Sequence, residues 1–228
     1  ILTGSQQFNL MAGITQSLAG RTVILKLLPF SLREISTYRG FSTDELLLNG
    51  GYPSVYSENL PAPLFYQNYV ETYIERDLRQ IVNIKDLNHF RRFLKLAAGR
   101  VGQLLNHTAL AGEVGVTART IHAWISLLEA SFIAFQLPPF HENRSKRLIK
   151  SPKLYFYDPG LAAHLLGIET APQMSRDPLR GALFENLALC EMIKRDFNSG
   201  RNPDLCFYRD SNGVEVDIVR QAGRELIL

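Results

Sequence analysis

Residues 106–157 contain the local pattern that most restricts the fold of this chain. Asn106 interrupts a helical stretch, Thr108 is suited to cap a short helix, and Gly115 supplies a tight turn. Thr117 then caps a longer helix that runs to about residue 130, and its apolar positions share one face: Ile121, Trp124, Ile125 and Leu128. A short helix, a glycine turn and a longer helix have the spacing of a helix-turn-helix.

Two β-rich segments follow these helices, at residues 132–137 and 148–157. Two strands after a helix-turn-helix predict a winged helix, in which the loop between the strands is the wing. The predicted wing, residues 141–153, reaches into the second segment and contains five bases, namely Arg144, Lys146, Arg147, Lys150 and Lys153. Bases on such a loop contact the phosphates of nucleic acid, and the second helix would present Arg119, Thr120 and His122 to it. The pattern therefore predicts DNA binding, while a winged helix that binds a partner protein remains the alternative.

Composition excludes several classes of protein. Hydrophobic residues make up 46% and charged residues 21% of the 228 residues, so the chain is not intrinsically disordered. It contains no apolar run long enough to cross a membrane, so we expect no membrane partner. Two cysteines are too few for a disulfide scaffold or a cysteine-rich zinc site, which favours the reducing cytoplasm.

A second candidate site combines carboxylates from two predicted elements. Glu185 falls in a predicted helix at residues 181–197, and Asp217 falls in a strand that follows the hairpin turn at residues 210–213. A helix carboxylate and a strand carboxylate can converge to hold Mg²⁺, which activates water against a phosphodiester. Glu215 is two residues from Asp217 and shares its face, so it is a candidate third acid. In the alternative, both strand acids simply face solvent.

The first residues suggest a nucleotide-sensing role. Thr3 and Ser5 follow a short apolar segment, and polar residues at the end of a parallel strand are placed where nucleotides bind. Arg21 follows a predicted helix and could reach a γ-phosphate, although an ordinary turn and a surface arginine are the alternative. No phosphate-binding loop occurs in the chain, so we expect no ATP hydrolysis by it alone. Apolar residues at both ends favour a fragment of a longer protein.

Ten segments carry a family resemblance, and they occur in order along nearly the whole chain: ILTGSQQF, SLAGR, LLPFSLREI, GGYPSVY, YVETYIERDLRQI, LNHFRRFLKLAAGRVGQLLN, TIHAWISLLEASFIAFQLPPF, RLIKSPKLYFYDPGLAAHLLGI, LRGALFENLALCEMIK and FYRDSNGVEVDIV. Together they resemble the prokaryotic AAA+-type ATP-binding proteins that have a C-terminal domain of unknown function. The resemblance implies a mixed α/β, mostly helical fold. It also implies ATP and Mg²⁺ as cofactors of the full-length parent, with none held tightly by this chain.

The same resemblance divides the chain into four parts. Residues 1–35 would end an AAA+-type ATPase core, 36–83 would form a helical lid or linker, 84–157 a winged-helix-like domain, and 158–228 a truncated nuclease-like α/β domain of the PD-(D/E)XK type. Thr3 and Ser5 fall at the family's sensor position, and Arg21 falls at its arginine-finger or sensor position. Glu185 and Asp217 match the first two acidic positions of the nuclease motif, whose Glu/Asp-x-Lys element is missing here.

These observations predict a C-terminal fragment of an AAA+-type ATP-binding protein that associates with nucleic acid through a basic winged helix. The parent is expected to be an ATPase, and this fragment is expected to be inactive alone. A metal-dependent nuclease domain and a non-catalytic protein–protein interaction module are the two alternatives. Salt-dependent DNA binding separates the first prediction from the interaction module, and Mg²⁺-dependent cleavage identifies the nuclease.

Overall fold

The chain has the mixed α/β, mainly helical architecture that the sequence predicts, with two small antiparallel sheets. The computed structural model describes residues 25–78, 84, 86–140, 151–210, 213–222 and 225–227. Seven of the candidate site residues lie outside these ranges: Thr3, Ser5, Arg21, Arg144, Lys146, Arg147 and Lys150. None of the helices in the described ranges is long and apolar enough to cross a membrane.

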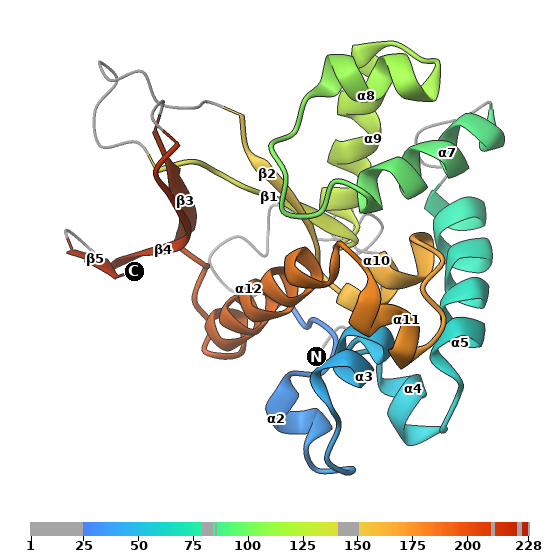
Figure 1. Cartoon of the computed structure of the whole chain (residues 1–228), viewed down its shortest axis with the longest axis vertical. Coiled ribbons are helices and arrows are strands. Elements are labelled where there is room, and N and C mark those ends of the chain that lie inside the picture. The colour runs from blue at the N-terminus through green and yellow to red at the C-terminus, as the bar shows by residue number, and fades with distance from the viewer. Residues whose placement is uncertain are drawn as a thin grey trace, which may run out of the picture.

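The predicted helix-turn-helix and the pair of strands after it, which together we call the winged helix, are present in the described residues. Helix α8 (His107–Val114) packs against both α7 (Leu87–Ala98) and α9 (Ala118–Ala130). Strands β1 (Ala134–Leu137) and β2 (Lys153–Phe156) follow and pair antiparallel, with α9 against β1. Figure 1 shows these three helices gathered at one end of the molecule, with β1 and β2 leading away from them.

Local signals in this region were read correctly except at one cap. The cap of α8 is Asn106 rather than Thr108, since the Asn106 side chain accepts a hydrogen bond from the Ala109 amide at 3.0 Å. Asn106 has the extended backbone that a capping residue requires. Gly115 adopts a φ of 89°, in the left-handed region that glycine tolerates, and Thr117 caps α9 as predicted.

The core of the winged helix is aromatic. Trp124 is 5% exposed, and its ring centroid lies 5.2 Å from that of Phe90 and 5.3 Å from that of Phe93. The remaining apolar positions that the sequence assigns to the inner face of α9 are also buried, namely Ile121, Ile125 and Leu128. The helical spacing of α9 therefore separates a packed face from an exposed one.

Short helices precede the winged helix. They are α2 (Leu32–Ile35), α3 (Thr43–Asn49), α4 (Pro53–Ser57) and α5 (Ala62–Tyr69), which continues into the π-helix η2 (Val70–Leu78). Ser31 and Ser42 begin α2 and α3 with capping boxes, completed by Glu34 and Glu45. Such caps stabilise helices that are too short to persist by propensity alone.

Helix α10 (Pro159–Leu165) connects the parts of the fold, since it packs against α3, α5, α7 and α12. Its cap is the buried Asp158, which accepts hydrogen bonds from the Leu161 amide, the Gly51 amide and the Tyr66 hydroxyl. Helix α11 (Ala171–Arg176) and the long α12 (Arg180–Asn198) follow. One continuous set of buried apolar residues extends from Ile35 to Phe207.

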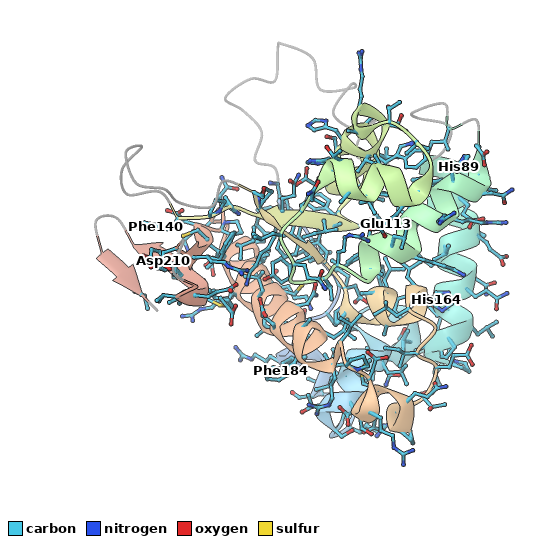
Figure 2. The ribbon with its side chains drawn as sticks, turned by 45° about the horizontal axis from the view of Figure 1, so that its top comes forward. His89, Glu113, Phe140, His164, Phe184 and Asp210 are labelled. Atoms are coloured by element: carbon cyan, nitrogen blue, oxygen red, sulfur yellow. The ribbon has the colours of Figure 1, made fainter. Side chains whose placement is uncertain are left out.

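The second sheet has the order β3-β4-β5, all antiparallel, with β3 at Leu205–Arg209, β4 at Glu215–Ala222 and β5 at Glu225–Ile227. The segment that leaves β1 extends this sheet on its β3 side. The Phe207 amide donates to the Pro138 carbonyl at 3.1 Å, and the Phe140 amide donates to the Phe207 carbonyl at 2.7 Å. Figure 2 accordingly shows Phe140 close to Asp210 at the sheet end of the molecule. The winged helix and the C-terminal hairpin are thus directly joined.

Candidate functional site

Four charged side chains from three elements meet at one place, which we call the Lys153 cluster: Lys153, Glu185, Glu215 and Asp217. The Lys153 ammonium lies 2.7 Å from a Glu215 carboxylate oxygen and 2.9 Å from Asp217 Oδ1. Glu185 Oε1 lies 3.6 Å from the same nitrogen. The three carboxylates therefore surround a single ammonium group.

Strand β2 and helix α12 place two members of the cluster. Lys153 begins β2, where it pairs with Leu137 of β1. Phe156, at the other end of β2, is bound at both its amide and its carbonyl by the Asn186 side chain, each at 2.8 Å. Because Glu185 precedes Asn186 in α12, these two bonds hold Glu185 against β2.

Strand β4 supplies the other two members. Glu215 begins β4 and Asp217 is two residues farther on, so both side chains project from one face, as the sequence predicts. Glu215 pairs with Arg209 in the β3–β4 register, and its carboxylate lies 3.4 Å from the Arg209 guanidinium. Asp217 is the most exposed member, with 58% of its side chain accessible.

Tyr155 extends the cluster from β2. Its hydroxyl donates a short hydrogen bond to Glu185. Burial, together with the bond to Glu185 and the charge of that carboxylate, raises the pKa of Tyr155 far above its ordinary value, so the hydroxyl stays protonated and remains a donor. Lys153 and Tyr155 are two residues apart in the strand and share a face.

Lys153 is charged although only 3% of its side chain is accessible. Burial lowers the pKa of Lys153, but the bonds to Glu215 and Asp217 and the charge of Glu185 raise it more, and the pKa lies above its ordinary value. With Arg209 included, the cluster holds three carboxylates against two cations. A buried charge of this kind is retained only when it is paired and hydrogen-bonded.

A resident metal ion does not fit this arrangement. Carboxylate oxygens are the ligands that Mg²⁺ prefers, so Glu185, Glu215 and Asp217 have suitable chemistry. However, all three approach the Lys153 ammonium, which occupies the position that a shared metal ion would take. Within the described ranges, no group of three histidine, cysteine or acidic side chains is placed to hold a metal ion.

Lys153 requires a correction. The sequence places it among the wing bases that contact phosphates, but its side chain is buried and its ammonium is bound by carboxylates. Tyr155 was not among the predicted site residues, and the lysine of the Glu/Asp-x-Lys element was taken to be missing. The alternation of Lys153 and Tyr155 on one face of β2, resembling that of Glu215 and Asp217 on β4, was the available signal.

The other described DNA-binding candidates lie on α9. Arg119 and His122 are exposed, whereas Thr120 is half-buried and its hydroxyl is hydrogen-bonded to that of Thr117 at 2.9 Å. Ser126 is exposed on the same side as Arg119 and His122, because the three residues are spaced by three and four positions. Helix α9 therefore has a polar outer face. Its residues are separated in sequence from the carboxylates of the Lys153 cluster by more than one element.

A histidine pair joins α8 to α9. The rings of His107 and His122 have centroids 5.6 Å apart, and His107 Nε2 is buried with no hydrogen-bond partner among the residues that the structure describes. Burial, with a smaller contribution from His122, lowers the pKa of His107. His107 is therefore neutral near pH 7 and contributes packing rather than charge to this surface.

Comparison with known proteins finds relatives that have not been characterised. An uncharacterised protein of Mycobacterium tuberculosis and one of Mycobacterium bovis are each 30% identical to this chain over 227 residues, covering 98% of the chain and 50% of the relative. An uncharacterised protein of Haemophilus influenzae is 25% identical over 215 residues, covering 87% of the chain and 52% of the relative. The chain therefore spans about half the length of the curated relatives it matches. No solved structure matches it.

Two family models match separate parts of the chain. Residues 180–228, which include α12 and the β3–β4–β5 sheet, match a domain of unknown function, DUF4143. Residues 41–171, which include the winged helix and α10, match another domain of unknown function, DUF8612. Lys153 and Tyr155 fall in the second match, and the three acids of the cluster fall in the first. Since residues 41–171 are more than half of the chain, it belongs to the family defined by the DUF8612 domain.

Proposed function

We propose that this chain binds DNA through its winged helix, as part of the C-terminal region of an AAA+-type ATPase. One observation carries the proposal. Helix α9 follows α8 across the Gly115 turn, packs Trp124 against α7, and leaves a polar outer face, and the antiparallel pair β1–β2 follows it. In a winged helix of this form, the second helix enters the major groove of DNA.

The exposed face of α9 has side chains suited to a nucleic-acid groove. Arg119 supplies a cation near the start of the helix, while His122 and Ser126 supply hydrogen-bonding groups farther along. The N-terminal end of α9 also directs backbone N–H groups toward an approaching phosphate. The wing bases Arg144, Lys146, Arg147 and Lys150 would add phosphate contacts, and their contribution stays a prediction.

The link to an ATPase rests on resemblance and on length. The segments that resemble AAA+-type proteins extend along nearly the whole chain, and residues 180–228 match DUF4143, a domain found in C-terminal regions associated with AAA ATPases. The relatives are about twice as long as this chain, which leaves room in them for a nucleotide-binding core. ATP and Mg²⁺ are accordingly proposed as cofactors of the full-length protein, with Thr3, Ser5 and Arg21 near the nucleotide.

Fluorescence anisotropy with a labelled DNA duplex tests the binding proposal. We expect saturable binding that weakens as salt increases, and Arg119→Ala should lower both the affinity and the slope of log affinity against log salt, the slope by about 0.9. Lys146→Ala and Arg147→Ala should each have a similar effect. Arg33→Ala is the matched control, because Arg33 is an exposed arginine on α2, outside the winged helix.

Two results would replace this proposal. If the chain binds no duplex even at low salt, the winged helix is a protein–protein interaction module instead. If DNA is cut when Mg²⁺ is added and Asp217→Asn prevents the cutting, the region is a nuclease. We rank cleavage second because the carboxylates that would bind the metal surround an ammonium group.

A further inference from the structure

We propose that Lys153 is the resident cation of the acidic cluster and that its ammonium keeps divalent cations out. Three carboxylates from α12 and β4 converge on one nitrogen, at distances between 2.7 and 3.6 Å. The nitrogen comes from β2, on a side chain that is almost completely buried. The inference concerns this cluster alone and does not depend on DNA binding.

The ammonium compensates the charge that would otherwise attract a metal ion. Glu215 and Asp217 lie two residues apart on one strand and Glu185 faces them from α12, so the three negative charges repel one another unless a cation lies between them. Lys153 supplies that cation with hydrogen bonds to Asp217 and Glu215, and Glu185 is within ion-pair distance. A hydrated divalent ion would have to displace the Lys153 ammonium, which is covalently attached to the chain.

Tyr155 and Phe156 keep the lysine in place. The Tyr155 hydroxyl holds Glu185 on the same face of β2 as Lys153, and the Phe156 backbone is bound by Asn186. The Lys153 ammonium also lies 5.3 Å from the centre of the Phe207 ring in β3. The cation is therefore held between β2, α12 and the β3–β4 hairpin, and its removal would leave the carboxylates facing one another.

Isothermal titration with Mn²⁺ tests the inference on the whole chain, with Lys153→Met as the principal variant. Methionine keeps the unbranched apolar stem and removes the charge. A unit charge within 4 Å of a divalent ion strongly opposes binding, so we expect Lys153→Met to bind Mn²⁺ at least about 100-fold more tightly than the unmodified chain. Adding Asp217→Asn to Lys153→Met should abolish the gain.

Lys194→Met is the matched control. Lys194 is as buried as Lys153, but its ammonium bonds the Phe30 carbonyl at 2.7 Å and a single carboxylate, Glu191, at 2.9 Å. Removing this lysine deletes the same buried charge without exposing three acids, so Mn²⁺ binding should not change. Circular dichroism on each variant establishes that it is folded.

Two outcomes would overturn the inference. One is a folded Lys153→Met variant that binds Mn²⁺ no better than the unmodified chain. The other is tight, saturable Mn²⁺ binding by the unmodified chain that Asp217→Asn abolishes, because the metal would then coexist with the ammonium. The second measurement uses no lysine variant, so it can overturn the inference even if Lys153→Met fails to fold.

Discussion

Replacing Asp158 with alanine should destabilise the whole fold, because this buried carboxylate joins three distant parts of the chain. It accepts a hydrogen bond of 2.7 Å from the Gly51 amide, one of 2.6 Å from the Tyr66 hydroxyl and one of 2.9 Å from the Leu161 amide. These donors lie in the turn before α4, in α5 and in the first turn of α10. Asp158 is 1% exposed, so water cannot readily replace it.

The magnitude follows from the number and kind of these bonds. A hydrogen bond to a charged group contributes about 1.5–3 kcal/mol, and each buried donor left without a partner adds a desolvation cost. Because contributions that share one acceptor are not additive, we expect Asp158→Ala to lower the free energy of unfolding by about 4–6 kcal/mol. In a chain of this size that loss corresponds to a decrease in Tm of about 10–20 °C.

Urea and thermal unfolding, followed by circular dichroism, measure this loss. Asp44→Ala is the control, because Asp44 also lies in the first turn of a helix but forms a partly exposed ion pair with Arg180, which typically contributes less than about 1 kcal/mol. Asp158→Asn keeps one acceptor oxygen, so its loss of unfolding free energy should lie between those of Asp158→Ala and Asp44→Ala. A loss below about 2 kcal/mol for a folded Asp158→Ala would refute the reasoning, since the three bonds would then be replaceable.

Two further predictions use the same unfolding measurements, and a third uses alkylation of a thiol. Trp124→Ala should lower the free energy of unfolding by about 3–5 kcal/mol, because the Trp124 ring packs against Phe90 and Phe93. Phe184 is 51% exposed, so Phe184→Ala should lower it little, and equal losses would contradict the packing of α9. Burial lowers the pKa of His107 below 6.5, so the stability present above that pH should be lost as the pH falls through the folded-state pKa. The urea midpoint should therefore drop between pH 7 and 5, and less so in His107→Gln; identical pH profiles would exclude His107 as the cause. Burial raises the pKa of Cys190 to about 12, so its thiol should react with iodoacetamide at pH 8 only after unfolding, and rapid alkylation of the native chain would show that it is accessible.

Local structure was largely predictable because its signals are local. Thr117 caps α9, Gly115 adopts a positive φ, and Trp124 is buried, as the residue types and their spacing indicate. The cap of α8 was misassigned to Thr108 because two polar residues only two positions apart, Asn106 and Thr108, both satisfy the sequence rule. Only the backbone conformation selects Asn106.

The hairpin was predictable for the same reason. Alternation between Val214 and Val219 places Glu215 and Asp217 on one face of a strand, and the turn residues before it predict the connection to β3. The residue pattern left the convergence of Glu185 with these acids as one of two alternatives, because no local rule connects a helix to a strand about thirty residues later. The family resemblance favoured the convergence. The structure brings all three acids to the same nitrogen.

The sequence by itself determined the helix-turn-helix, the hairpin and the three acids, because each follows from neighbouring residues. Only the tertiary structure decided which cation they meet. Lys153 lies 64 positions before Asp217, in a basic stretch that looks like a solvated wing, and its hydrogen bond to Asp217 depends on how α12 and the hairpin pack against β2. The sequence shows that Lys153 is basic but not where its side chain points. In the fold the side chain points toward three carboxylates and not toward solvent, where a phosphate could reach it.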